Sequence, residues 1–351
     1  MDNQRTINPT GRVLLIYTGG TIGMGINHQT NALEPLDFNH LVSNLPEMKY
    51  LTTGIDVFQF DHPIDSSDMA PELWASLVRI IAEKYEAYDG FVILHGTDTM
   101  AYTASALSFM LENLTKPVIL TGSQLPIEHL RTDAKENLIT SIELASAQHE
   151  DGTPVVPEVC IYFSGRLLRG NRSTKQNADG FNAFDSFNYP HLCEAGVRFQ
   201  FSTHHILKPD YTKPMVPHFE LNPNIMVLSL FPGIQASIFK HALDAPELKG
   251  VVMRSFGSGN APQQPWLMEI LKKASQRGVT IVNISQCVTG FVEMGRYDTG
   301  YQLKDTGVIS GQDSTVEAAV TKLMYLYGRY GDDTKTIRQM LSCSLAGELH
   351  V

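Results

Sequence analysis

Short apolar runs alternate with longer segments of helical periodicity through the first half of the chain. Runs rich in β-branched or aromatic residues predict buried parallel strands at residues 13–17, 91–95, 118–121 and 159–163. Between them, apolar residues recur at helical spacing and predict helices at residues 72–85, 99–114 and 133–147. This alternation indicates an α/β fold, with a doubly wound sheet in a larger N-terminal domain.

The periodicity lapses in a proline-rich, polar stretch at residues 208–224, which is typical of a linker. It then resumes, with strands expected at residues 225–231, 250–254 and 279–284 and helices at residues 265–277 and 315–330. A chain of 351 residues also exceeds the usual size of a single domain. We therefore predict an N-terminal domain over residues 1–207, a linker over 208–224 and a smaller C-terminal α/β domain over 225–351.

Composition and charge narrow the functional class. The formal net charge of −10 argues against nucleic-acid binding, because such surfaces need clustered Lys and Arg. The N-terminus lacks a positive segment followed by an apolar one, and no stretch reaches about 18 unbroken apolar residues, so neither secretion nor membrane insertion is expected. Four scattered cysteines fit a reducing, cytoplasmic location. Neither the cysteines nor the histidines form a metal-ligand pattern, so no metal site is predicted.

A glycine-rich turn follows the first predicted strand, at residues 18–23. Glycines permit a tight turn with positive φ just beyond the carboxyl end of a strand, where α/β proteins bind ligands. One interpretation is a plain turn or a dinucleotide loop, but the spacing is not G-x-G-x-x-G and no helical period follows directly. The other interpretation is that the turn exposes the hydroxyl of Thr21.

Hydroxyls and a carboxylate also follow the predicted strand at residues 91–95. Here Thr97, Asp98 and Thr99 stand at a strand end, although any of them could instead cap the next helix. Two threonine-bearing loops on neighbouring strand ends favour a functional site over capping.

Two further polar stretches have both a functional and a structural interpretation. Residues 65–69 hold small polar groups suited to ligand capture, yet Asp68 could serve only as a cap for the helix that follows. Residues 170–175 follow the strand at 159–163, where a solvated basic turn would account for Lys175.

Residues 17–24 and 91–114 resemble the two signature segments of bacterial L-asparaginases, closest to the type I cytoplasmic branch. The resemblance continues over nearly the whole chain, at residues 66–69, 121–124, 170–181, 253–262 and 310–322. Agreement over so many segments is more specific than any single loop. The chain is therefore identified as a member of the asparaginase/glutaminase family.

This resemblance implies hydrolysis of L-asparagine to L-aspartate and ammonia through a threonine acyl-enzyme, without a cofactor. Thr21 is similar to the family nucleophile, on a loop that closes over the substrate. A second threonine belongs to a catalytic triad, which here would be Thr97, Lys175 and Asp98. The resemblance also implies a set of substrate-binding residues: Ser66, Ser67, Asp68, Thr97 and Asp98.

The chemistry leaves the role of Lys175 open. A threonine hydroxyl is a poor nucleophile and needs an adjacent base. A lysine becomes a base only after it loses its proton, which a neighbouring carboxylate such as Asp98 disfavours. Either Asp98 binds mainly the substrate ammonium, or Lys175 stays charged and only orients Thr97 and a water.

The sequence departs from the family in the loop beyond Thr21. Family members often place an activating tyrosine there, whereas residues 27–33 contain none. Tyr17 precedes the nucleophile and is expected to be a strand residue. His28 is a candidate substitute.

The resemblance also implies regulation and assembly. Type I enzymes bind asparagine at an allosteric site between subunits, and Thr174, Arg254 and Cys287 match its positions. Arg254 could instead pair with a carboxylate, and Cys287 could be a buried small hydrophobe. The assembly that the family implies is a homotetramer, a dimer of dimers.

Several alternative functions remain to be weighed. A glutaminase would differ by one substrate methylene, which changes binding by only about 1 to 3 kcal/mol. A related amidase domain releases ammonia in tRNA-dependent amidotransferases, which require partner subunits. An inactive asparagine sensor would fit the missing tyrosine, and nucleotide binding would rest on fold analogy alone. The joint presence of Thr21, Thr97, Asp98 and Lys175 favours the asparaginase.

Overall fold

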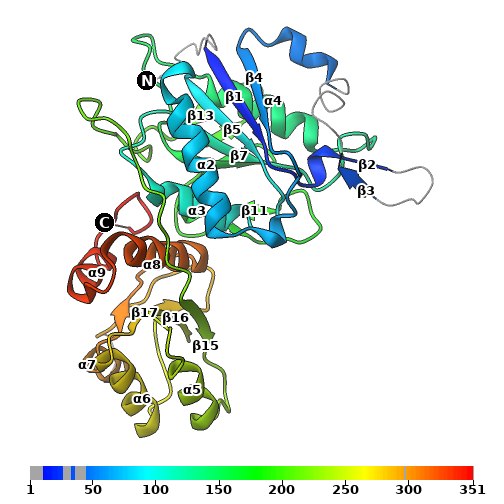
Figure 1. Ribbon diagram of the computed structural model, residues 1–351. Helices are drawn as coiled ribbons and strands as arrows, with labels where there is room; N and C mark the ends of the chain where they lie inside the picture. Colours follow the sequence, from blue (N-terminus) through cyan, green and yellow to red (C-terminus); the bar gives the residue numbers. More distant parts are fainter. Residues whose placement is uncertain (1–10, 27–32, 36–44, 296–297, 351) are drawn as a thin grey trace. The chain divides into compact units, whose positions relative to one another are not determined.

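The computed structural model describes residues 11–26, 33–35, 45–295 and 298–350. The chain divides into two compact units, one up to Phe219 and the other from Glu220 onward. Figure 1 colours the first unit from blue to green and ends the second in red. Of the helices within the described ranges, none combines the length and the apolar character needed to cross a membrane.

Over the described residues, the first unit is organised around a sheet of eight strands in the order β13-β12-β9-β8-β7-β5-β1-β4. The strands from β4 to β8 run parallel, and β9, β12 and β13 extend the sheet in antiparallel fashion. Buried β-branched and aromatic residues fill the central strands, as expected for a sheet covered on both faces. The bounds are β1 (Arg12–Tyr17), β4 (Gly54–Gln59), β5 (Gly90–Leu94), β7 (Val118–Thr121), β8 (Val159–Phe163), β9 (Arg166–Arg169), β12 (Cys193–Ala195) and β13 (Phe199–Phe201).

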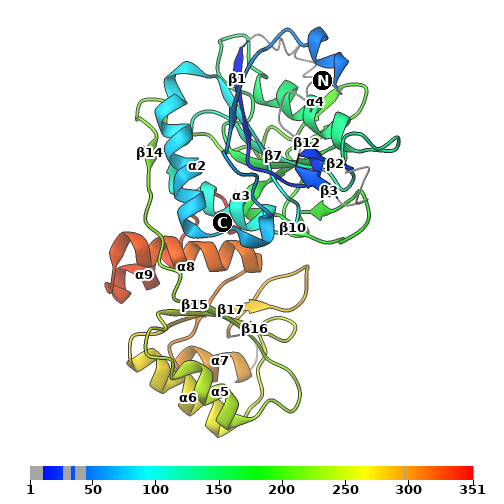
Figure 2. The same ribbon diagram turned by 45° about the vertical axis from the view of Figure 1, so that its right-hand side comes forward.

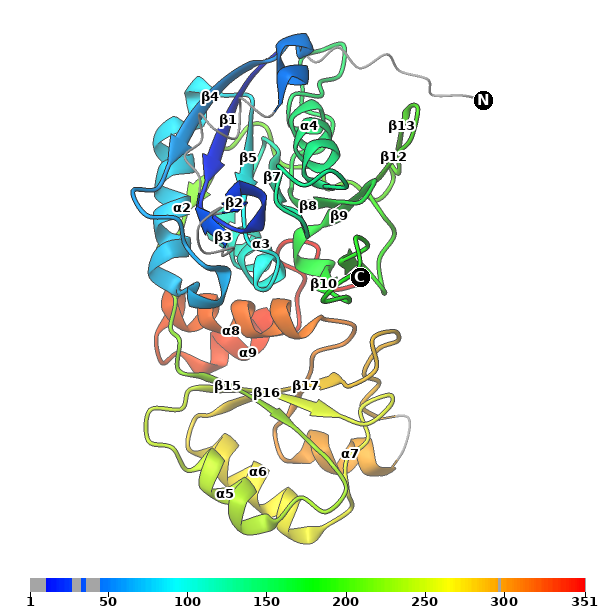
Figure 3. The ribbon, with the colours of Figure 1, turned by 90° about the vertical axis from the view of Figure 1, so that its right-hand side faces the viewer.

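Helices cover both faces of this sheet (Figures 2 and 3). α2 (Pro71–Lys84) and α3 (Met100–Met110) lie on one face, and α4 (Ala134–Ala145) lies on the other. Alternate strand positions face α4, so that Leu138 of α4 and Leu15 of β1 share one buried cluster. The crossovers through α3 and α4 advance across the sheet in the same direction but on opposite faces. The two crossovers therefore have opposite hands, so one of them is left-handed. This is unusual, because about 98% of such crossovers are right-handed.

The helix predicted at residues 99–114 is longer than α3. The residues directly after α3, Leu111–Glu112 (β6), pair antiparallel with Val216–Pro217 (β14) instead. Asn113 then adopts a φ of +55°, a left-handed conformation that asparagine tolerates and that reverses the chain. Its side-chain amide donates to three backbone carbonyls between residues 210 and 214. Part of the proline-rich stretch is thereby held against the first unit.

The second unit contains a smaller parallel sheet in the order β15-β16-β17-β18. Figure 3 shows α5, α6 and α7 on one face of this sheet and α8 on the other. The α/β class predicted for both parts of the chain is confirmed. The bounds are β15 (Ile225–Ser229), β16 (Gly250–Ser255), β17 (Thr280–Ser285), β18 (Ile309–Ser310), α5 (Ala236–Leu243), α6 (Pro265–Gln276), α7 (Asp298–Asp305), α8 (Val316–Tyr330) and α9 (Thr334–Leu341).

Candidate active site

The candidate site lies along the carboxyl edge of the large sheet. Loops after the adjacent parallel strands β4, β1, β5 and β7 carry the polar residues singled out in the sequence. Carboxyl ends of neighbouring parallel strands meet at one edge, where open α/β sheets bind ligands. β1 and β5 pair directly, with Tyr17 opposite Leu94 at their last positions. The two threonine-bearing loops therefore leave the sheet side by side.

Thr21 begins a 3₁₀ turn, Thr21–Gly23, directly after two glycines. Gly20 has a φ of +91°, and a Cβ built there would lie 2.6 Å from the backbone nitrogen of Gly96. Only glycine permits both the positive φ and this close approach. The turn that carries Thr21 therefore packs, backbone to backbone, against the residue that precedes Thr97.

Lys175 joins Thr97 and Asp98 in one cluster. It lies on β10 (Thr174–Lys175), a short strand that pairs with β11 (Phe184–Asp185). The Lys175 ammonium donates to Thr97 Oγ1 at 2.8 Å and to Asp98 Oδ1 at 2.7 Å. The Lys175 side chain is 18% exposed and that of Asp98 is 66% exposed, so the lysine is enclosed while the carboxylate still faces solvent.

The direction of these hydrogen bonds bears on the role of Lys175. An ammonium that donates to both neighbours has no lone pair with which to accept the Thr97 proton. With Lys175 as an ammonium, this arrangement is compatible with the second of the two roles considered above, in which Lys175 orients the Thr97 hydroxyl. The exposed carboxylate of Asp98 can at the same time accept from a cationic group of a ligand.

Gln124 is a site residue that the sequence interpretation did not single out. Thr97 Oγ1 donates to its Oε1 at 3.3 Å, and its Nε2 donates to two backbone carbonyls in residues 178–180. Gln124 thus links Thr97 to a second loop. The available signal was a polar side chain just beyond the predicted strand at 118–121.

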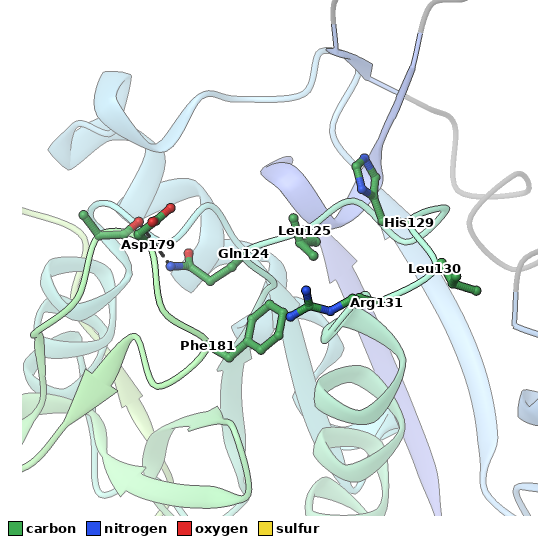
Figure 4. Close-up of a pocket in the computed structure, with 8 residues that line it drawn as sticks. Gln124, Leu125, His129, Leu130, Arg131, Asp179 and Phe181 are labelled. Atoms are coloured by element: carbon green, nitrogen blue, oxygen red, sulfur yellow. Dashed lines mark hydrogen bonds between the residues drawn. The ribbon is translucent and has the colours of Figure 1, made fainter.

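A pocket of about 480 Å³ adjoins this link (Figure 4). One wall comes from the loop after β7 and the other from residues 178–181. Figure 4 shows Gln124 directed toward the second loop, with Leu125 and Phe181 between the two walls. Its lining mixes apolar side chains with groups of both charge signs, including Gln124, Leu125, His129, Arg131, Asp179 and Phe181.

The polar loop after β4 forms a 3₁₀ turn, Ser66–Asp68. Asp65 caps this turn by accepting from the Ser67 amide at 2.9 Å and from the Ser67 hydroxyl at 2.8 Å. The backbone hydrogen bond first, and the hydroxyl second, lower the pKa of the Asp65 carboxyl. Ser67 and Asp68 are exposed, and Ser66 is buried.

Neither Asp68 nor Thr99 makes a side-chain cap, although Thr99 stands at an N-cap position. The N-cap of α2 is Ala70, which makes no side-chain cap, and Asp68 lies before it. Thr99 is the N-cap of α3, but its hydroxyl donates to the carbonyl of Ser66 at 2.6 Å. This bond ties the 66–68 turn to the loop of Thr97 and Asp98, so the two polar loops form one structure.

A series of buried hydrogen bonds connects α2 and α3 to the loop that carries Thr97 and Asp98. Trp74 Nε1 donates to Thr103 Oγ1 at 2.9 Å, and Thr103 lies 2.9 Å from His95 Nε2. His95 Nδ1 lies 2.7 Å from the Gly96 carbonyl. Because a carbonyl can only accept, Nδ1 carries the proton and Nε2 accepts from Thr103. The Gly96 carbonyl therefore points inward, and across the trans peptide the Thr97 N–H points the opposite way.

We expect His95 to make folding stability depend on pH. Burial lowers the pKa of His95 to about 4 from an ordinary 6.5. The unfolded chain therefore binds a proton between these values while the folded chain does not. The contribution is fully present above pH 6.5 and is lost as the pH falls toward 4, by about 3 kcal/mol in total.

Urea unfolding at pH 7, 5 and 4 measures this dependence. A His95→Gln variant, which has no titrating ring, should be less stable at pH 7 and should lose less stability on acidification. Equal acid sensitivity of the two proteins would contradict the assignment.

The proposed effector residues lie in both units. Thr174 is on β10 in the first unit, while Arg254 on β16 and Cys287 belong to the second. Within the described chain, the buried Nε of Arg254 has no hydrogen-bond partner. Cys287 is exposed, so it is not the buried hydrophobe considered above.

Two other sequence inferences concern this region. Residues 27–32, including His28, lie outside the described residues. Over the residues that are described, no group of three or more His, Cys, Asp or Glu side chains could hold a metal ion.

Comparison with known proteins places this geometry in a family. Residues 12–207 match the model of the asparaginase N-terminal domain, and residues 224–341 match the model of the glutaminase/asparaginase C-terminal domain. The chain is 45% identical to L-asparaginase 1 of Escherichia coli K12, over 96% of this chain and 97% of that protein. It is also 39% identical to the 60 kDa lysophospholipase of Mus musculus, over 98% of this chain and 64% of that longer protein.

A solved structure agrees with the sequence comparison. L-asparaginase I of Vibrio cholerae superposes with a TM-score of 0.87 and 41% identity, over 97% of this chain and all of that one. Two family models cover most of the chain, and an L-asparaginase relative aligns with 96% of it. This chain belongs to the asparaginase family.

Proposed function

We propose that this protein is a type I L-asparaginase, which hydrolyses the side-chain amide of L-asparagine to L-aspartate and ammonia. The observation that carries the proposal is the Thr97, Lys175 and Asp98 cluster, which packs beside the Thr21 turn in a chain 45% identical to an L-asparaginase. Two hydroxyls, an ammonium and a carboxylate at one sheet edge suit an amino-acid amide, which carries groups of both charges.

In the proposed mechanism, the Thr21 hydroxyl oxygen attacks the amide carbon of the substrate. The resulting oxyanion needs N–H donors, and the Thr97 N–H is a candidate because the Gly96 carbonyl is turned inward by His95. Collapse of the tetrahedral intermediate breaks the C–N bond, and the proton that the Thr21 hydroxyl gave up during the attack is delivered to the leaving nitrogen, which departs as ammonia. Water then hydrolyses the β-aspartyl ester, restoring the Thr21 hydroxyl.

The α-groups of the substrate can be assigned to the two polar loops. Asp98 is exposed beside Lys175 and can accept from the α-ammonium. The Ser66–Asp68 turn, tied to the same loop by Thr99, offers hydroxyls and an exposed Asp68 to the α-groups. Thr97, which adjoins Asp98 in the chain and bonds to Lys175, can orient a water or assist the Thr21 hydroxyl.

Ammonia release from L-asparagine and, separately, from L-glutamine tests the proposal. We expect asparagine to have the higher kcat/KM, because the loops are fixed by backbone contacts and the added methylene of glutamine displaces its amide by one carbon; one methylene corresponds to about 10- to 200-fold. Higher kcat/KM for glutamine would instead favour the glutaminase. Asparagine binding without ammonia release would favour the sensor.

The same rate measurement addresses regulation. We further propose a cytoplasmic homotetramer, built as a dimer of dimers, in which asparagine also acts as an activator through Thr174, Arg254 and Cys287. The unpartnered Arg254 Nε supports a ligand contact there. A sigmoidal dependence of rate on asparagine concentration is the expected result, and a hyperbolic curve would remove the effector site.

A further inference from the structure

Tyr17 is the last residue of β1, and its side chain forms a hydrogen bond with the turn that carries Thr21. This side chain is 1% exposed within a buried cluster that also contains Ile22 and Leu94. A buried phenol requires a polar partner. Tyr17 finds it in the carbonyl of Gly23, to which its hydroxyl donates at 3.2 Å. Burial raises the pKa of Tyr17 to about 12, so the phenol keeps its proton and remains a donor.

Gly23 provides the other half of this contact. A Cβ built there would lie 2.1 Å from the Tyr17 hydroxyl oxygen and 2.5 Å from the ring carbon that bears it. Because these atoms belong to a packed ring, they cannot move aside cheaply. Position 23 therefore requires glycine, because the Tyr17 ring occupies the space that a side chain would need.

The Tyr17 contact closes the turn around Thr21. The Gly23 amide donates to the Gly20 carbonyl at 3.2 Å, and the Met24 amide donates to the Thr21 carbonyl. Gly20 is held against Gly96 at the start of the turn, and Tyr17 holds Gly23 at its end. Thr21 lies between these two fixed points.

We propose that Tyr17 is a positioning residue for the nucleophile, since its phenol holds the Gly23 carbonyl and thereby fixes the turn that presents Thr21. The inference rests on the proposed function only in that Thr21 is the nucleophile. Tyr17 exchanges no proton with Thr21 and is not a catalytic residue. Its effect on the reaction is to set where the Thr21 oxygen lies relative to the amide carbon.

The test compares Tyr17→Phe with a matched control, Tyr85→Phe. Tyr85 is also a buried tyrosine of the first unit, bonded to Thr115, but it lies ahead of β5, at the opposite end from the site. Each variant loses only a hydroxyl. We expect Tyr17→Phe to lower kcat for asparagine about tenfold, the equivalent of one hydrogen bond, with little change in KM because the substrate contacts lie on other loops. Tyr85→Phe should leave kcat unchanged.

Amide hydrogen exchange provides a readout that does not depend on activity. The Gly23 and Met24 amides bond within the turn, so a peptide covering residues 19–25 reports its opening. Exchange in this peptide should rise about tenfold in Tyr17→Phe and stay at the wild-type rate in Tyr85→Phe. If the wild type does not hydrolyse asparagine, the proposed function fails, while this measurement still decides whether Tyr17 holds the turn.

A Gly23→Ala variant completes the experiment as a double-mutant cycle. The added methyl group should displace the turn, and adding Tyr17→Phe should cause little further loss in kcat, because both changes act on one contact. Unchanged exchange in Tyr17→Phe would contradict the proposal. Unchanged kcat in an active enzyme, or fully additive losses in the double variant, would do the same.

Discussion

A Thr21→Ala variant is expected to lose asparagine hydrolysis by at least about 10⁴-fold, because no other group replaces a deleted nucleophile in acyl transfer. The fold should be retained. The Thr21 turn is held by Gly20, Gly23 and Tyr17, and none of these contacts uses the Thr21 hydroxyl. Steady-state ammonia release, read beside circular dichroism and the thermal unfolding midpoint, separates lost chemistry from lost structure.

Thr53→Ala is the matched control for this variant. The Thr53 hydroxyl is buried in the first unit, where it donates to Ser146 at 3.0 Å just ahead of β4. This position is at the amino ends of the strands, away from the candidate site. Its loss should cost stability and spare kcat. Retention of wild-type activity in Thr21→Ala, as expected for Thr53→Ala, would show that Thr21 is not the nucleophile.

Replacing Lys175 with methionine should lower kcat about 10³-fold, because the change removes the charged donor that orients Thr97 and balances Asp98. Methionine keeps most of the side-chain volume, so packing is largely preserved. It also leaves Asp98 as an unpaired but exposed carboxylate, which can be hydrated. The loss should therefore appear mainly in kcat, in single-turnover as well as steady-state assays.

Lys116→Met is the corresponding control. The Lys116 ammonium also donates to two acceptors, the carbonyls of Tyr85 and Tyr88 at 2.5 and 2.8 Å, but it lies before β7 and outside the site. A comparable loss of kcat in both lysine variants would point to general destabilisation. Retention of kcat in Lys175→Met would remove the triad from the mechanism.

The parts of the fold that were predicted from the sequence are those in which local pattern and tertiary burial agree. Residues 91–94 form a continuous apolar run within the predicted strand, and β5 is buried at every position. By contrast β4 was missed, because an edge strand is only partly buried and has no such run. The end of α3 was misjudged, since apolar residues continue at helical spacing to Leu114, whereas Leu111–Glu112 pairs with β14, far along the chain.

The candidate site was likewise predicted only in part. The sequence predicted that its loops lie at one edge of the sheet, because each loop follows a strand and the strands are parallel. The approach of Lys175 to Thr97 spans 78 residues and depends on a short hairpin, which no local pattern predicts. The capping interpretation of Asp68 was wrong. Asp65, not Asp68, caps the 66–68 turn through the Ser67 amide, and α2 begins only at Pro71 with Ala70 as its N-cap.

The backbone contact between Gly20 and Gly96 limits how this protein can be re-engineered. No side chain of any size fits at Gly20, so a mutational library that varies it would consist almost entirely of inactive members. The exposed residues Ser67 and Asp68 carry no such restriction. Libraries aimed at new amide substrates should therefore diversify Ser67, Asp68 and the pocket beside Gln124, and leave the paired glycines untouched.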